Sequence, residues 1–420
     1  MENAIQIIKT LENAGYTAYI AGGAVRDMLM GKTPNDYDIA TSAKPEVVCS
    51  LFPKCIKTGI RHGTVTVLMN SAAYEVTTYR TESGYTDNRR PDSVVFVTDI
   101  NDDLMRRDFT VNAMAYHYEK GIIDPFCGRE DIKARIMRCV GNPAERFSED
   151  ALRMLRCVRF ASVLNFKIDP DTFNAIIELS GSIKNISAER IKQELDKLLT
   201  ADNASIAELY SSGLLKQILP EIVIKSPAQA KIIEDRVKSV SKSVAARWAA
   251  FLWDVADDAP IITNRLKFSN ALKREVLGVL KYKLNSVPVT KKDVKQLLNK
   301  TELAFYTWLE LKKAEKRENE QIISEQIISE QMLSDRMLSD RTVSLAKNLA
   351  QDIEKNGEPY LIRHLKVSGS DVLNAGFKPQ DVKKVLEMLL DAVMDNPQKN
   401  SFPELTKMMQ EYKNLKDKEQ

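Results

Sequence analysis

A glycine pair followed shortly by two alternating aspartates is the feature that most constrains this chain. Gly22 and Gly23 follow a short apolar run, and Asp36 and Asp38 flank Tyr37. Side chains two residues apart in a strand share a face, so both aspartates can hold hard cations while Tyr37 faces away. Glycines let backbone N–H groups approach a phosphate at the start of a helix. Together the two features predict a nucleoside triphosphate held on Mg²⁺.

Each half of this pattern also has a simpler interpretation. A glycine pair on its own is most often a turn, and two alternating aspartates are often solvated turn residues. Their combination favours the functional interpretation, because an amphipathic helix is predicted between them from Val25, Met28 and Leu29.

The composition limits the class and compartment of the protein. With 420 residues the chain can form about two or three domains. A formal net charge of +3 does not by itself argue for nucleic-acid binding, so a polyanion site must come from local clusters. No apolar run reaches the ~18 residues that span a bilayer, and the first residues lack the basic start and apolar core expected of a signal peptide. Five cysteines without a CxxC pair predict reduced thiols in a cytoplasmic protein, and three histidines argue against a histidine-rich metal site.

Hydrophobic patterning divides the chain into two regions. Before about residue 120, a helix is predicted over 5–15 and β-branched, alternating runs predict strands over 16–20, 64–68, 74–79 and 94–97. After about residue 145, apolar residues recur at i, i+3 and i+4 and strand signals vanish. The expected fold is α+β, with an N-terminal α/β head built on a small mixed sheet and an all-α remainder.

A five-residue repeat occupies positions 320–339. Five residues advance a helix by about 500°, so successive apolar pairs rotate by about 140° and form no single stripe. The repeat therefore predicts a helical or partly disordered insert rather than a coiled coil.

Two further clusters could serve a nucleotide site. Glu75 lies in a predicted strand and could bring a third carboxylate to the metal, although a strand glutamate is often merely solvated. The segment 106–112 is expected to open a helix with Asp108 near its N-cap. Asp108 and Asn112 would then share a face and contact ribose hydroxyls, while Arg107 reaches phosphate. The alternative is a capping aspartate beside solvated arginines.

A charged stripe is predicted on a helix over 149–160, in which every third residue is charged: Asp150, Arg153, Arg156 and Arg159. A buried stripe should run beside it: Leu152, Leu155 and Val158. The arginines suit a triphosphate or a base edge. A carboxylate next to a guanidinium accepts from the exocyclic amine of cytosine or adenine and repels the carbonyl oxygen of uracil or guanine. A solvated salt bridge is the simpler alternative.

These motifs match one family in order along the chain. The segments GGAVRD, DYD, GIRHGTVTV, EVTTYR, RRDFTVNAMAY, DPFCGREDI, EDALRMLRCVRFA and ISAERIKQEL resemble the class II CCA-adding tRNA nucleotidyltransferases over about residues 16–200. The resemblance implies template-independent addition of CCA to tRNA from CTP and ATP, by two-metal (Mg²⁺) nucleotidyl transfer that releases pyrophosphate. It also implies tRNA as the macromolecular partner. The oligomeric state stays open.

The resemblance assigns roles and boundaries. Metal and catalytic roles fall to Asp36 and Asp38 with Glu75 as a supporting carboxylate. Nucleotide contacts fall to eight residues: Gly23, Arg26, Arg107, Asp108, Asp150, Arg153, Arg156 and Arg159. The implied domains are a catalytic head (1–138), a base-recognising neck (139–200), a body (201–310) and a tail that includes the repeat (311–420), the last two binding tRNA.

Related activities are separated by smaller features. Residues 80–92 resemble a loop that CC-only relatives lack, and 59–67 resemble the CCA-adding form rather than poly(A) polymerases. The repeat and the segment 368–379 depart from the family pattern. The alternatives are a partial enzyme that adds only CC or only A, and a non-catalytic RNA-binding protein with a vestigial head.

Overall fold

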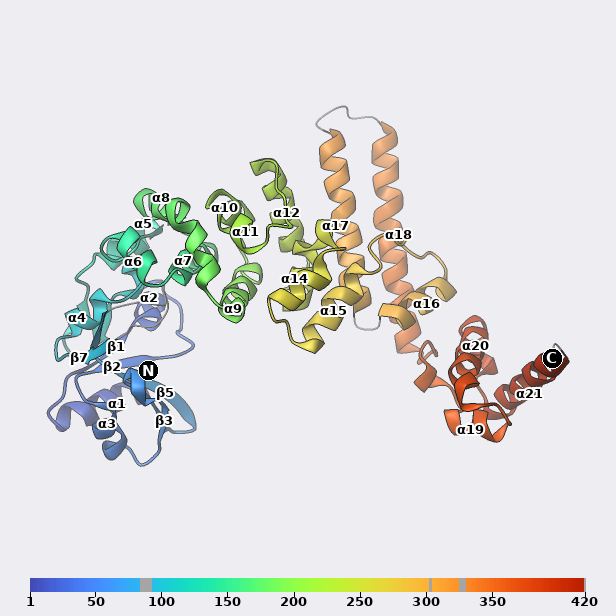
Figure 1. The fold of residues 1–420 in the computed structure, drawn as a ribbon, viewed down its shortest axis with the longest axis horizontal. Helices are drawn as coiled ribbons and strands as arrows, with labels where there is room; N and C mark the ends of the chain where they lie inside the picture. Colours follow the sequence, from blue (N-terminus) through green and yellow to red (C-terminus); the bar gives the residue numbers. More distant parts are fainter. Residues whose placement is uncertain (84–92, 302–303, 325–329, 419–420) are drawn as a thin grey trace. The chain divides into compact units, whose positions relative to one another are not determined.

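The computed structural model describes residues 1–83, 93–301, 304–324 and 330–418, which divide into two compact units (Figure 1). The first unit comprises Met1–Glu234 and Ile261–Lys267, and the second comprises Asp235–Pro260 and Phe268–Gln420. The first unit holds the sheet and all the residues to which a site was assigned.

A seven-stranded mixed sheet forms the head of the first unit. Its strand order is β3-β4-β5-β2-β1-β8-β9. The strands are β1 (Ala18–Ala21), β2 (Asp38–Thr41), β3 (Cys55–Gly59), β4 (Thr64–Met69), β5 (Ala72–Thr78), β8 (Ala115–His117) and β9 (Gly121–Ile123). Only β2 and β5 pair in parallel, and the other neighbours are antiparallel. The α+β prediction with a mixed sheet is confirmed.

Helices cover this sheet and complete its core. They are α1 (Glu2–Asn13), α2 (Gly23–Leu29) and α3 (Pro45–Leu51). The buried side chains of α1 recur with helical spacing, and they pack on apolar side chains of the strands: Ala4, Ile7, Ile8 and Leu11. A smaller cluster joins β1 to Ile100 and Leu104 of α4 (Ile100–Met105).

Short strands outside the main sheet were missed in part. β6 (Arg80–Ser83) pairs with β7 (Ser93–Phe96), whereas only the latter was expected. β10 (Ile136–Met137) pairs with β11 (Lys167–Ile168), so the prediction that strands end before residue 145 is wrong at this two-residue bridge. Of the predicted loop 80–92, residues 84–92 lie outside the described part of the chain.

Helices make up the rest of the first unit. They are α5 (Gly128–Ala134), α6 (Pro143–Glu149), α7 (Leu152–Leu164), α8 (Pro170–Leu179), α9 (Ala188–Leu199), α10 (Ile206–Ser211), α11 (Leu214–Ile218), α12 (Pro227–Ser239, which runs on into the second unit) and α14 (Ala259–Arg265). The buried stripe of α7 is confirmed, since Leu152, Leu155 and Val158 are all buried. α7 packs against α9, and α7 carries three arginines of the predicted neck: Arg153, Arg156 and Arg159.

The second unit is helical throughout its described residues. Its helices are α13 (Val244–Phe251), α15 (Asn270–Leu280), α16 (Lys291–Thr301), α17 (Phe305–Ser324), α18 (Glu330–Lys355), α19 (Gly369–Asn374), α20 (Val382–Asp395) and α21 (Phe402–Lys418). The repeat falls at the end of α17 and the start of α18, which confirms helix for 320–324 and 330–339, while 325–329 lie outside the described part. Among the described helices, none is both long and apolar enough to cross a bilayer.

One prediction about the cysteines is wrong. A disulfide joins Cys49 and Cys55, whose Cα atoms lie 5.2 Å apart. The two residues are brought together because the turn between α3 and β3 is short. Cys127, Cys139 and Cys157 are free thiols, as expected.

Candidate active site

A cavity of about 550 Å³ opens in the first unit where the head meets α7 and α9. Seven arginines and four carboxylates are among the residues that line it: Arg26, Arg80, Arg106, Arg107, Arg153, Arg156, Arg190, Asp38, Glu75, Asp108 and Asp150. The excess of guanidinium groups gives the cavity the charge and the planar donors that suit a polyphosphate.

The glycine pair forms one wall of the cavity. Gly22 has φ +76°, and a Cβ at this position would lie 2.5 Å from Nη1 of Arg107. Gly22 is therefore required both by its backbone conformation and by the guanidinium packed against it. Gly23 begins α2, and a Cβ there would lie 3.4 Å from Nη2 of Arg26.

The parallel pairing of β2 and β5 brings two carboxylates together. Ile39 is the partner of Val76, so the residues just before them, Asp38 and Glu75, lie side by side on one face of the sheet. Asp36 lies outside the strand, because β2 begins at Asp38, so the prediction that both aspartates share a strand is wrong.

The electrostatics of Asp38 nevertheless connect all three carboxylates. Partial burial and the nearby charge of Glu75 raise the pKa of Asp38. Asp36 adds to this rise, and Arg107 opposes it. Arg107 does not fully balance the negative charge of this group, so a cation would be favoured there.

The oxygen donors fit a hard divalent cation that is shared with a substrate. Within the described ranges, no three acidic, histidine or cysteine side chains converge into a ready-made metal cage. Mg²⁺ is commonly held by one or two carboxylates together with substrate phosphate oxygens. Asp38 and Glu75 at the cavity wall match this mode, and Asp36 stands beside them without lining the cavity.

A buried carboxylate that the sequence did not reveal orients two of the cavity arginines. Asp103 is 0% exposed and accepts hydrogen bonds from Arg106 Nε at 2.9 Å and from Arg107 Nη2 at 3.3 Å. The predicted helix over 106–112 is wrong: α4 ends at Met105, and only Thr110–Asn112 form a 3₁₀ turn. Asp103 was not identified because it lies on α4, a helix that the sequence did not predict, and its partners follow just after the end of that helix.

Asp108 connects the head to α7. Its Oδ2 accepts hydrogen bonds from Nε and Nη2 of Arg156, and its Oδ1 lies 3.4 Å from Nδ2 of Asn112. The expected closeness of Asp108 and Asn112 is confirmed, although no helix N-cap produces it. Burial alone would raise the pKa of Asp108, but the charge of Arg156 outweighs it and holds the pKa below the ordinary value.

Arg26 reaches from α2 toward the same region. Its Nη1 donates to Oδ1 of Asn112 at 2.6 Å, and its Nε and Nη2 donate to Asp27. The guanidinium also lies over the Phe160 ring, 5.6 Å from its centroid. Arg26 is thus a fixed, largely buried cation at the cavity wall.

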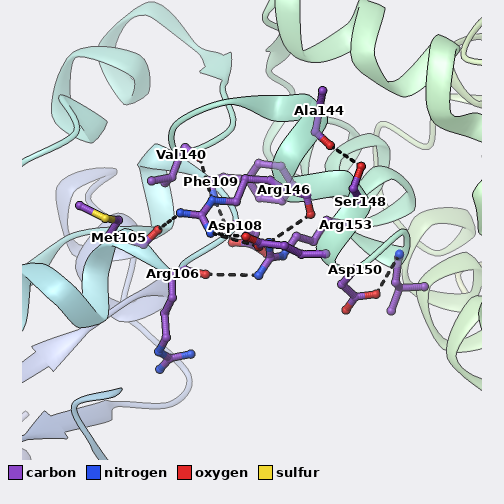
Figure 2. Close-up of polar contacts among 12 residues, drawn as sticks. Met105, Arg106, Asp108, Phe109, Val140, Ala144, Arg146, Ser148, Asp150 and Arg153 are labelled. Carbon is purple, nitrogen blue, oxygen red and sulfur yellow. Dashed lines mark hydrogen bonds and ion pairs between the residues drawn. The ribbon is translucent and has the colours of Figure 1, made fainter. Parts of the chain in front are cut away.

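The two residues predicted to read a base both line the cavity, but they are held by different partners. Asp150 precedes α7 rather than lying in it, and its Oδ1 accepts from Leu152 N at 3.0 Å. Arg153 donates to Glu149 and to the carbonyl oxygens of Arg146 and Arg106. Figure 2 shows the Arg153 guanidinium directed toward Arg106 and the Asp150 carboxylate turned toward the start of α7.

The stripe of arginines divides at its end. Arg156 lines the cavity, whereas Arg159 does not. Arg159 is 7% exposed and donates through Nε to Glu194 of α9. Of the predicted site residues, Asp36 and Arg159 are those outside the cavity lining. The lining residues without a predicted role include Arg80, Arg106 and Arg190; Arg80 and Arg190 stand inside the quoted segments EVTTYR and ISAERIKQEL, where no periodic stripe distinguishes them.

Two family profiles match the first unit. Residues 18–138 match the family described as "Poly A polymerase head domain". Residues 165–225 match the one described as "Probable RNA and SrmB- binding site of polymerase A".

Curated relatives share the name CCA-adding enzyme. The chain is 45% identical over 251 residues to that of Leuconostoc mesenteroides, 44% over 280 residues to that of Anoxybacillus flavithermus and 53% over 223 residues to that of Lactobacillus helveticus. These segments cover 60%, 66% and 53% of this chain and 62%, 70% and 56% of the respective relatives. The chain therefore spans between about half and about two thirds of the curated relatives that it matches.

Solved structures extend the likeness along the whole chain. The CCA-adding enzyme of Bacillus stearothermophilus in complex with CTP matches with a TM-score of 0.78 at 30% identity, covering 100% of this chain and 99% of that one. The Thermotoga maritima enzyme complexed with tRNA matches with a TM-score of 0.63 at 21% identity, covering 97% and 94%. The second likeness shows a shared fold.

Proposed function

The chain belongs to the CCA-adding enzymes, and we propose that it adds C, C and then A to the 3′ end of tRNA, using CTP and ATP. One observation carries this proposal. A single cavity is lined by the neighbouring carboxylates Asp38 and Glu75, by a group of arginines, and by Asp150 and Arg153, which we propose read the base. A solved relative of the same fold and 30% identity is described in complex with CTP.

The reaction joins the 3′ hydroxyl of tRNA to the α-phosphate of the nucleotide, and pyrophosphate leaves. Arg107, fixed by buried Asp103, lies against the glycine pair where phosphate is expected. The cavity arginines hold the triphosphate and balance the charge that develops on the leaving pyrophosphate. Asp108 and Asn112 lie together for contact with ribose hydroxyls.

Nucleotidyl transfer in this family is metal-dependent, and Mg²⁺ is the ion proposed here. Asp36, Asp38 and Glu75 would hold it together with phosphate oxygens, because their grouped charges already disfavour one another. When bound, Mg²⁺ would stabilise the negative charge on the attacking and leaving oxygens. The carboxylates would place that ion at the cavity wall, and the arginines would orient the triphosphate beside it.

Base choice comes from the protein rather than from a template strand. The carboxylate of Asp150 accepts from N4 of cytosine or N6 of adenine, and Arg153 donates to the neighbouring ring nitrogen. Uracil and guanine present an oxygen to Asp150 and are disfavoured. Arg156 adds charge at the cavity wall, and Arg159, paired with Glu194, supports the α7–α9 contact beneath it.

The remaining helices are proposed to bind tRNA. The enzyme is proposed to be cytoplasmic. Residues 139–200 are taken as the neck, 201–310 as the body and 311–420 as the tail. The lysines and arginines of the body and tail helices would contact phosphates, so tRNA affinity should fall steeply with salt.

The test is product sizing on a defined substrate. A tRNA that ends at its discriminator base is supplied with CTP, with ATP, or with both, and the products are resolved to single nucleotides. Two additions with CTP and three with both nucleotides support CCA addition. A stop at two additions with both nucleotides identifies a CC-only enzyme. A second substrate, a tRNA that already ends in CC, identifies an A-only enzyme if it is the one substrate that accepts a nucleotide, and no incorporation on either substrate identifies a non-catalytic protein.

A further inference from the structure

Arg190 on α9 forms a direct ion pair with Asp150 at the wall of the cavity. Its Nη2 donates to Oδ2 of Asp150 at 2.8 Å, and its Nη1 lies 3.4 Å from Oδ1. Both side chains line the cavity, and both are partly covered, with 26% of Arg190 and 14% of Asp150 exposed. The pair links α9 to the turn that precedes α7.

The carboxylate of Asp150 is held at both oxygens. Oδ1 accepts from the backbone N–H of Leu152 and, over 3.4 Å, from Nη1 of Arg190, and Oδ2 accepts from Nη2 of Arg190. Each carboxylate oxygen has two acceptor positions, so these bonds fix the plane of the group and leave an acceptor position on Oδ2 for a ligand. Without Arg190, only the Leu152 bond would restrain rotation of the side chain.

Arg153 lies three residues after Asp150 and could attract the carboxylate if Arg190 did not hold it. A carboxylate three residues before an arginine is attracted to that arginine, and a close pair would compete with a base for both groups. Arg153 is drawn toward Glu149 and two carbonyl oxygens, and Arg190 draws Asp150 toward α9. Each half of the base-reading pair thus has its own anchor.

We propose that Arg190 is a positioning residue that fixes the Asp150 carboxylate in the orientation that reads the exocyclic amine of the incoming base. This inference rests on the proposed function, because it concerns how that site distinguishes C and A from U and G. Arg190 acts through Asp150, and its effect should appear in base selectivity rather than in tRNA binding.

Packing alone does not account for Arg190. The buried face of α9 is formed by other residues: Ile191, Glu194, Leu195, Leu198 and Leu199. Arg190 stands beside that face at the cavity. Lys192 on the same helix provides a matched control, because it pairs with Asp196 at 2.5 Å and does not line the cavity.

The experiment compares Arg190→Met, Arg190→Lys and the control Lys192→Met. For each variant, kcat/KM is measured with CTP, UTP, ATP and GTP on tRNA primers of the appropriate length. Arg190→Met should lower the CTP/UTP and ATP/GTP preferences by about five- to tenfold, within the range of one bidentate base contact. Arg190→Lys should restore part of that loss, and Lys192→Met should preserve both preferences.

A double variant separates positioning from a structural role. If Arg190 acts through Asp150, adding Arg190→Met to Asp150→Ala should change selectivity no further. An equal loss with all four nucleotides, or an additional loss of selectivity in the double variant, would overturn the proposal. If Arg190→Met does not fold, Arg190→Lys decides, since unchanged selectivity there also overturns it. A wild-type protein that incorporates neither CTP nor ATP would instead refute the proposed function.

Discussion

Arg156 donates two hydrogen bonds, of 2.9 and 2.6 Å, to one carboxylate oxygen of Asp108, 48 positions earlier in the chain. The carboxyl is nearly buried, with 10% of its side chain exposed. This ion pair fastens α7 to the segment that follows α4. Arg156 therefore keeps its position at the cavity through a contact that also stabilises the first unit.

The Asp108–Arg156 pair should make stability depend on pH in one direction. Because the pKa of Asp108 in the folded protein lies below its ordinary value of 3.8, the stabilisation is complete above that value and is lost as pH falls through the folded pKa. Asp108→Asn should cost about 1–3 kcal/mol at neutral pH. Thermal unfolding is measured for the wild type and Asp108→Asn from pH 7 to pH 3. The difference in stability between the two proteins should narrow below about pH 4. A constant gap down to pH 3 would contradict this account.

Gly22→Ala should weaken nucleotide binding beyond its cost in stability. The new Cβ would meet Arg107 Nη1 at 2.5 Å and displace the guanidinium from the phosphate position. Gly31→Ala is the matched control, since Gly31 has a similar φ of +70° with nothing within 4 Å. Both should lose stability because an L residue is strained at positive φ, and Gly22→Ala should lose more because of its contact with Arg107. Only Gly22→Ala should raise KM for CTP and ATP. Equal KM values in the two variants would show that Arg107 does not contribute to phosphate binding.

Asp150→Ala should relax base selection as well as slow the reaction. Removing the carboxylate ends its repulsion of the carbonyl oxygens of UTP and GTP, which contributes about 1–3 kcal/mol, or roughly 5- to 150-fold. The measurement is kcat/KM for all four nucleotides. If every nucleotide slows by the same factor, Asp150 only supports the start of α7 and selection lies elsewhere.

Deleting Gly84 to Arg90 should spare the two C additions and suppress the final A. One base-reading pair must accept a pyrimidine and then a larger purine, so part of the head must reposition between the steps. The deleted residues lie outside the described part of the chain, between β6 and β7. Product sizing measures both steps, with CTP on tRNA ending at the discriminator base and with ATP on tRNA ending in CC. Equal loss of C and A addition would identify the segment as structural.

Local patterns in the sequence predicted part of the head, without β3, β8 and β9, and the change to helices. Together with the family resemblance they named nine residues that line the cavity. Alternation indicated β4 and β5, and the step of three indicated the arginines of α7, because both are short-range periodicities. Long-range contacts were not accessible in this way. Arg190 acts on Asp150 across 40 positions of sequence through tertiary packing, and Arg159 shares the stripe of Arg156 yet turns to Glu194 because α9 packs there. The contacts of Asp103 are local, but α4, which carries Asp103, was not predicted.

The most direct test of the account compares nucleotide incorporation by the wild type and by Asp38→Asn, with Asp171→Asn on the exposed start of α8 as the control. Asp38→Asn keeps the side-chain shape but removes the charge that would hold the metal. We expect C and A incorporation to fall by roughly 10²-fold or more, because metal assistance contributes several kcal/mol, while tRNA binding persists. Asp171→Asn should match the wild type. Near-normal incorporation by Asp38→Asn would contradict the claim that this cavity carries the catalysis.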